Sequence, residues 1–193
     1  MNRQHILIAA VASAFVLVAG SATAHDKRFG HFKNYIATHL VPAQEVPLVL
    51  SQGSGQFKAV IDEVNQTITY ELSYKDLESP PQQSHIHIGQ KNVNGGVTFF
   101  LCGNPGNTPA TVPPAAFPQP PACPASPDTI TGVITPANLV GPLSQGVTPA
   151  DFAKVVGALR SGDTYANVHT TRSPGGEVRG QVKIGFLNDR DWD

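Results

Sequence analysis

The sequence predicts an all-β protein: a Greek-key β-sandwich or barrel of about eight strands, with one short helix near 149–160. Two observations lead to this fold class. Apolar and polar residues alternate with a period of two through most of the chain, and successive side chains of a strand point to opposite faces. Turn signals rich in Gly, Pro and Asn separate these short segments at regular intervals.

The expected strands follow one another closely. The clearest is 67–74, in which apolar or aromatic residues alternate strictly with polar ones. A short polar turn joins it to 55–61, so these two segments predict a hairpin. The turn Asn94-Gly95-Gly96 joins 85–88 to 97–101 in the same way. The remaining strands are expected at 35–41, 130–134, 165–169 and 178–184.

One segment has helical spacing. Thr148 suits an N-cap, Pro149 the first helical position and Asp151 the first turn, where its charge complements the helix dipole. Apolar residues then recur at helical spacing from Phe152 to Leu159, and Gly162 is expected to end the helix. This apolar stripe is expected to face the core.

The first 24 residues have the pattern of a secretory signal peptide. Arg3 precedes an almost unbroken apolar run at 6–19, and Ala22-Thr23-Ala24 has the small residues of a cleavage site. An uncleaved anchor is the alternative. We therefore expect an exported protein, periplasmic or extracellular, whose single domain spans 25–193. No membrane span is expected after signal cleavage, because no second apolar stretch reaches the required length.

The charge balance excludes some partners. The chain has 13 Lys and Arg against 14 Asp and Glu, a net charge of −1, and no run of like charge. Nucleic acids and anionic lipid surfaces attract strongly basic patches, so neither is an expected partner. An unidentified protein or a component of the cell envelope is the expected partner instead.

The two cysteines, Cys102 and Cys123, are expected to form a disulfide, since an exported protein folds in an oxidising compartment. Binding of a metal by their thiolates is the alternative. The segment 103–124 between and after them contains eight prolines, which cannot donate backbone hydrogen bonds in a sheet. The sequence thus predicts a Pro-rich insertion at 102–123, closed by the disulfide.

Three histidines are the best indication of chemistry. On a strand, His85 and His87 share one face, and His169 shares a face with Asn167. Three imidazoles on neighbouring strands suit copper or zinc, with an open position for water. Asn167, Glu45 and Glu177 are expected outer partners that fix the histidine tautomers. The alternative is a polar seam in which the histidines bind no metal.

The N-terminus of the cleaved chain offers another possibility. His25 would carry a free α-amine beside its imidazole, and this pair could chelate copper with His31 or His39. The alternative is a frayed terminus without a ligand.

Several ordered motifs resemble the CHRD domain over residues 31–186. They are Ala43-Gln44-Glu45-Val46-Pro47, Ser54-Gly55, His85-Ile86-His87, the segment 165–170 and the segment 176–181. The CHRD domain is repeated in the animal protein chordin, an extracellular growth-factor antagonist, and occurs alone in exported bacterial proteins. The resemblance implies a non-catalytic binding or structural module. An ion pair between Glu45 and Arg179, both in these motifs, is expected to lock the first strand to the last.

The chain is also similar, more distantly, to Cu,Zn superoxide dismutase, an all-β Greek-key protein with a disulfide. That similarity implies His85, His87 and His169 as copper ligands and Arg179 as the arginine that guides the anion. The histidine-rich zinc loop of that family has no counterpart between the two motifs. Nucleophile elbows, phosphate loops and paired carboxylates do not occur either, which favours a role without catalysis. A metal-binding protein, in one form similar to superoxide dismutase, is the alternative function.

Overall fold

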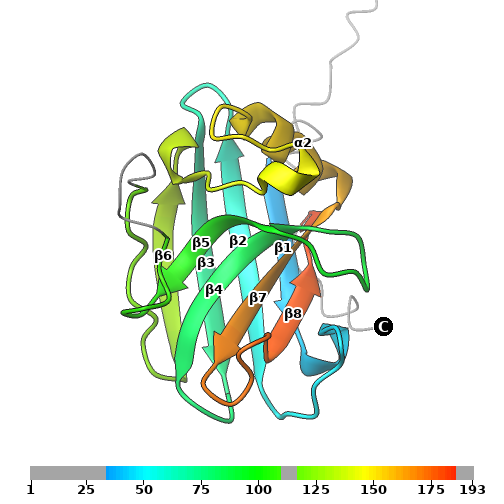
Figure 1. Cartoon of the computed structure of the whole chain (residues 1–193), viewed down its shortest axis with the longest axis vertical. Helices are drawn as coiled ribbons and strands as arrows, with labels where there is room; N and C mark the ends of the chain where they lie inside the picture. The colour runs from blue at the N-terminus through cyan, green and yellow to red at the C-terminus, as the bar shows by residue number, and fades with distance from the viewer. Residues whose placement is uncertain (1–33, 110–116, 186–193) are drawn as a thin grey trace, which may run out of the picture.

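Two antiparallel sheets pack face to face as a sandwich (Figure 1). The computed structural model describes residues 34–109 and 117–185. The expected signal peptide, His25 and His31 lie outside them. The strands are β1 (Tyr35–Leu40), β2 (Ser54–Asp62), β3 (Thr67–Lys75), β4 (Pro81–Ile88), β5 (Val97–Gly103), β6 (Asp128–Ile134), β7 (Thr164–Thr170), β8 (Val178–Gln181) and β9 (Lys183–Ile184). The all-β sandwich prediction is confirmed.

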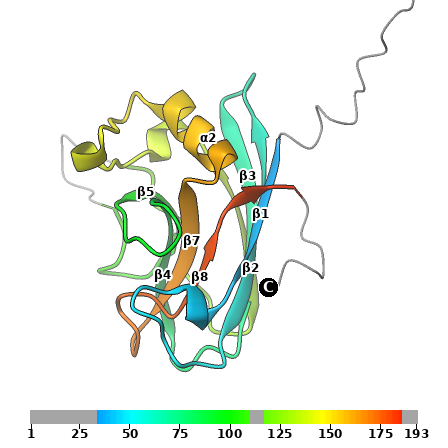
Figure 2. The same ribbon diagram turned by 90° about the vertical axis from the view of Figure 1, so that its right-hand side faces the viewer.

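The connections cross repeatedly between the two sheets. One sheet has the order β6-β3-β2-β1-β9 and the other the order β5-β4-β7-β8. Strands distant in sequence are therefore neighbours, as in β3 with β6 and β4 with β7. The two layers and the loops that join them at the ends of the sandwich are visible in Figure 2. This crossing brings β4 beside β7, which matters for the site below.

The last predicted strand, 178–184, divides into two. Residues Val178–Gln181 pair with β7, whereas Lys183–Ile184 pair with β1 of the other sheet. Between them Val182 is fully buried and its backbone N–H donates to the carbonyl of Thr164. The chain therefore changes sheets at Val182, which gives nine strands in the described residues where about eight were expected.

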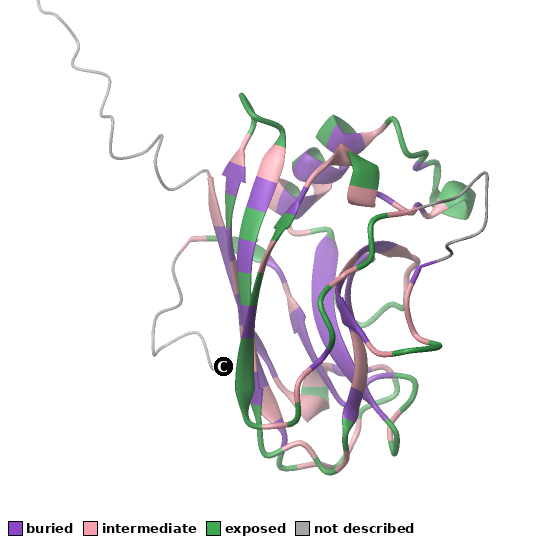
Figure 3. Cartoon of the chain, turned by 90° about the vertical axis from the view of Figure 1, so that its left-hand side faces the viewer, coloured by how far each residue is buried: buried purple, intermediate pink, exposed green. Residues whose placement is uncertain are grey.

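Alternation along the strands builds the core. In β3 the residues Ile68, Tyr70, Leu72 and Tyr74 are buried, while the residues between them are exposed or partly exposed. They meet Ile86 and other apolar side chains of the second sheet. The alternating purple and green along the strands follows this pattern (Figure 3). Each fully buried Ile or Leu contributes about 1.5–3 kcal/mol.

The helix α2 (Phe152–Ser161) covers one end of the sandwich (Figure 1). It begins three residues later than the position predicted from Pro149. Asp151 occupies the N-cap, and its carboxylate accepts hydrogen bonds from the backbone N–H and the hydroxyl of Thr148, which closes a turn before the helix. Gly162 ends the helix in the left-handed region, as expected. Among the described residues, no helix is long and apolar enough to cross a membrane.

The proline-rich insertion is closed at its base. Cys102 and Cys123 form a disulfide, so their sulfurs are not free to bind a metal. The side chain of Asn104 reinforces the closure, donating to the carbonyl of Pro81 and accepting from the N–H of Cys123. The disulfide and the hydrogen bonds of Asn104 thus hold the end of β5 against the segment that leads to β6.

We expect the double variant Cys102→Ala with Cys123→Ala to lose about 3 kcal/mol of unfolding free energy. The two cysteines are 21 residues apart in sequence. Closing a loop of that size lowers the entropy of the unfolded chain, which raises its free energy by roughly this amount. Urea denaturation measures it, and wild-type protein under reducing conditions is the matched comparison. Equal stability of the oxidised and reduced proteins would contradict the account.

Candidate metal centre

The pairing of β4 with β7 builds the site. Its register places His85 opposite Asn167 and His87 opposite Tyr165, with Gln83 opposite His169. Ile86 and the apolar residues of β7 point into the core, so the histidines occupy the other face of this sheet. An outward face of a sandwich usually meets solvent. Here His85 is only 3 % exposed, and His87 and His169 are each 7 % exposed.

Loops bury this face. The segment that follows β1 lies against β8, because Val41 forms an antiparallel β-bridge with Arg179. The loop between β4 and β5 folds over the same face, and the side chain of Asn94 in that loop donates to the carbonyl of Val46. These loops lie along the outer side of β7 and β8 in Figure 2. The histidines therefore form an enclosed polar layer outside the apolar core.

The three imidazoles converge on one point. The Nδ1 atom of His85 lies 3.2 Å from the Nε2 atom of His169. One nitrogen from each of His85, His87 and His169 can be chosen so that all lie within 4.8 Å of one another. Three nitrogens at such spacing can bind one ion. No other group of this kind occurs among residues 34–109 and 117–185.

Backbone carbonyls fix two of the tautomers. The Nδ1 of His87 lies 2.9 Å from the carbonyl of Gly95, and the Nδ1 of His169 lies 2.9 Å from that of Pro174. A carbonyl oxygen only accepts, so each Nδ1 carries the hydrogen and each Nε2 keeps its lone pair. The Nε2 atom of His87 is buried without a hydrogen-bond partner. A buried lone pair without a partner is uncommon, and a metal would satisfy it.

The carbonyls that hold these tautomers were not among the predicted partners. Both belong to glycine-containing turns, Asn94-Gly95-Gly96 and Pro174-Gly175-Gly176, that the sequence shows beside the histidine strands. A Cβ atom at Gly95 would overlap the carbonyl of Ile88, so only glycine lets this turn fold so close. The glycines beside the histidine strands were the feature of the sequence from which this arrangement could have been predicted.

Aromatic contacts hold the rings in place. His87 stacks on Tyr165 with ring centroids 4.6 Å apart and planes 5° from parallel. The guanidinium carbon of Arg179 lies 3.4 Å from the centroid of the same Tyr165 ring. Two groups this close cannot share one face, so Tyr165 lies between His87 and Arg179. His85 packs edge-on against Phe100, with centroids 4.4 Å apart.

Burial keeps the imidazoles neutral. It lowers the pKa of His85 to about 2 and that of His87 to about 4, and it lowers the pKa of His169 as well. The neighbouring imidazoles add to this effect at His85. A neutral imidazole is the form that binds metal ions, so the cluster is ready to bind a metal at neutral pH.

The hydrogen bonds of Arg179 go to residues other than the expected Glu45, although the charge of Arg179 still lowers the pKa of the Glu45 carboxyl. The guanidinium of Arg179 donates instead to the side-chain oxygen of Asn94 and to the carbonyls of Val93 and Gln90. The loop between β4 and β5 folds over Arg179 and supplies these acceptors. With 1 % exposure, Arg179 is also not the anion-guiding arginine that the similarity to superoxide dismutase implied. It fastens the loop that carries Gly95.

Glu45 lies close to the cluster but does not join it. Burial raises the pKa of its carboxyl to about 7, although the charge of Arg179 and hydrogen bonds from Val46 and Asn167 act against this rise. Gly176, with φ at +127°, packs directly against the carboxyl, and a Cβ there would collide with Oε1. Glu45 thus lies beside Asn167, which in turn lies beside His169.

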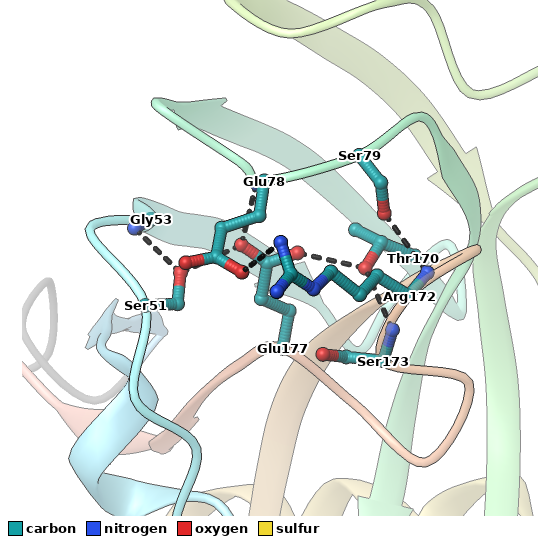
Figure 4. A network of polar contacts seen from close by, with 8 residues as sticks. All are labelled: Ser51, Gly53, Glu78, Ser79, Thr170, Arg172, Ser173 and Glu177. Atoms are coloured by element: carbon teal, nitrogen blue, oxygen red, sulfur yellow. Dashed lines mark hydrogen bonds and ion pairs between the residues drawn. The ribbon is translucent and has the colours of Figure 1, made fainter.

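Glu177 does not contact the histidines, contrary to the prediction that it fixes a tautomer. Its carboxylate accepts from the hydroxyl of Ser51 and the N–H of Glu78 through Oε1, and from the hydroxyl of Thr170 through Oε2 (Figure 4). Thr170 also accepts a hydrogen bond from the N–H of Ser173. This buried carboxylate joins three loops at one end of the sandwich, including the turn that carries Pro174.

The fold and the site define a β-sandwich protein with an enclosed histidine cluster on one sheet. The family model of the CHRD domain matches residues 36–182, so the chain belongs to the CHRD family. The match includes Glu45, the three clustered histidines and Arg179. Among curated proteins and among solved structures, none matches the chain.

We expect Gly176→Ala to destabilise the fold by about 2 kcal/mol. The substitution adds a methyl group where the Glu45 carboxyl lies, and it does so at a positive φ that non-glycine residues adopt with strain. Gly175→Ala is the matched control, since a Cβ at Gly175 meets nothing within 4 Å and should change stability by at most about 0.5 kcal/mol. Urea unfolding measures both variants, and equal effects would contradict the packing described.

In protein stripped of metal, we expect the unfolding free energy to fall as the pH drops from 6.5 towards 4. The pKa values of His85, His87 and His169 are below the ordinary 6.5, so their stabilising contribution is complete above pH 6.5 and is lost on acidification. Between the ordinary pKa and its lowered value, a histidine contributes a slope of up to about 1.4 kcal/mol per pH unit.

Glu45 acts in the opposite direction in that pH range. Its pKa is raised from 4.5 to about 7, so its contribution is complete below pH 4.5 and is lost as the pH rises through 7. Three imidazoles outweigh one carboxyl, and stability therefore decreases overall towards acid. Urea unfolding with chelator at a series of pH values measures the slope. Stability that stays level or rises from pH 6.5 to pH 4.5 would show that the histidines are not held neutral.

Proposed function

We propose that this chain is an exported, non-catalytic module of the CHRD family that binds one copper or zinc ion at His85, His87 and His169. The observation that carries the proposal is the convergence of three neutral imidazoles whose ligand nitrogens lie within 4.8 Å. Two of these rings donate through Nδ1 to backbone carbonyls, which directs their Nε2 lone pairs into the cluster.

The chemistry of the donors favours copper or zinc. Imidazole nitrogen is a ligand of intermediate softness that suits both metals, and a cluster of three occurs in many of their sites. Magnesium and calcium prefer oxygen ligands, and the cluster contains no carboxylate. The burial of all three rings also removes competing solvent, which strengthens the attraction between an ion and fixed dipoles.

The export proposal rests on the sequence of residues 1–24 and agrees with the disulfide. Disulfides persist in oxidising compartments and are rare in the reducing cytosol. A protein or a component of the cell envelope remains the expected partner of the module.

The test is metal analysis of purified protein after reconstitution with Zn²⁺ or Cu²⁺ and removal of free ion. We expect one ion per wild-type chain. His87→Gln and His169→Gln should each reduce the bound metal to a small fraction, since each removes an imidazole ligand at similar side-chain volume.

His39→Gln is the matched control. His39 is a buried histidine of β1 and does not belong to the cluster. The variant should keep one ion per chain. Wild-type protein that stays free of metal would contradict the proposal. If only His39→Gln loses its metal, the ion is bound by the N-terminal histidines and not by the cluster.

A further inference from the structure

Asn167 lies beside the imidazole of His169. It is on β7, 2 % exposed, directly opposite His85 and two residues before His169. Its side-chain oxygen Oδ1 lies 3.0 Å from the Nε2 atom of His169. This contact needs an explanation, because an amide oxygen only accepts hydrogen bonds and the Nε2 atom of His169 has a lone pair.

The hydrogen positions follow from the neighbours of His169. The carbonyl of Pro174 can only accept, so Nδ1 of His169 carries the hydrogen and Nε2 has a lone pair. The amide oxygen Oδ1 of Asn167 also presents lone pairs. Two lone pairs that face each other at 3.0 Å repel, and a bound cation between them converts the repulsion into attraction.

Glu45 favours this orientation of the Asn167 amide. The oxygens of the Glu45 carboxyl present lone pairs, which attract the N–H groups of an amide more than its oxygen. Both the Nδ2 atom of Asn167 and the Oε1 atom of Glu45 lie close to the position that a Cβ on Gly176 would take. The amide NH₂ therefore faces Glu45, and the oxygen faces the imidazoles.

Two contacts within the cluster have separations that suit ligands on one ion. In a tetrahedral zinc site with bonds of about 2.0 Å, neighbouring ligand atoms lie about 3.3 Å apart. The contact of His85 Nδ1 with His169 Nε2 is 3.2 Å, and that of Asn167 Oδ1 with His169 Nε2 is 3.0 Å. Both contacts therefore have nearly the separation of two ligands on a tetrahedral ion.

We propose that Asn167 Oδ1 is a fourth protein ligand, completing a site with His85 Nδ1, His87 Nε2 and His169 Nε2. This inference rests on the proposed metal binding and specifies it further. Sites with four protein ligands are closed and structural, whereas catalytic sites keep a position open for water. An amide oxygen is a hard donor, so the site is specific for divalent ions, Zn²⁺ or Cu²⁺, and disfavours Cu⁺.

The test uses Co²⁺ as a spectroscopic substitute for Zn²⁺ in the whole protein. Azide binds to cobalt only where water or an open position is available. In wild-type protein we expect the visible cobalt bands of a four-coordinate site, unchanged by azide. In Asn167→Ala we expect the bands to shift on addition of azide and the Zn²⁺ affinity to fall at least about 10-fold.

Asn167→Asp is the matched variant, since it keeps an oxygen donor at the same position. It should retain cobalt bands that azide does not change. Circular dichroism of the metal-free variants shows whether each is folded, and the azide test on wild-type protein needs no variant at all.

The outcomes separate the two proposals. If wild-type protein binds cobalt and its bands shift with azide, the fourth position is open and Asn167 is not a ligand, while the three-histidine site stands. If Asn167→Ala keeps both the wild-type bands and the wild-type affinity, the same conclusion follows. If wild-type protein takes up no metal, both proposals are wrong.

Discussion

The antiparallel pairing of β4 with β7 is the constraint on which the rest of the site depends. Its register puts His85, His87, Asn167 and His169 on one face of the sheet, with Ile86 and Val168 on the other. A shift by one residue would turn every side chain of a strand to the opposite face. The apolar core therefore determines the register, and the register in turn brings the imidazoles together.

The polar face of this sheet stays buried because loops cover it, and each loop is held by a specific buried side chain. Arg179 holds the loop between β4 and β5, whose Gly95 carbonyl orients His87. Glu177 holds the turn after β7 through Thr170, and the Pro174 carbonyl in that turn orients His169. Two buried charged residues thus act on the cluster at a distance, each through a backbone carbonyl. A buried charge costs free energy unless it is paired or hydrogen-bonded, and both of these residues are.

The sequence predicted the strands and the meeting of the three histidines because alternation determines which face a side chain takes. It did not predict the change of sheet at Val182, since Val178 to Ile184 alternates as one strand does. The helix begins at Phe152 instead of Pro149 because the Asp151 carboxylate accepts a hydrogen bond from the backbone N–H of Thr148, which closes a turn before the helix. The partners of Arg179 were missed for a similar reason. They lie on a loop 85 or more residues away in sequence, and alternation does not show which loop folds over a sheet.

The most direct measurement of the central claim is an anomalous-difference map from crystals of the protein grown with Zn²⁺ and recorded at the zinc absorption edge. The account predicts one strong peak on the outer face of the sheet formed by β5, β4, β7 and β8, within about 2.2 Å of nitrogens from His85, His87 and His169. A crystal with the three rings in place and no peak among them, or a peak bound only elsewhere on the chain, would contradict it.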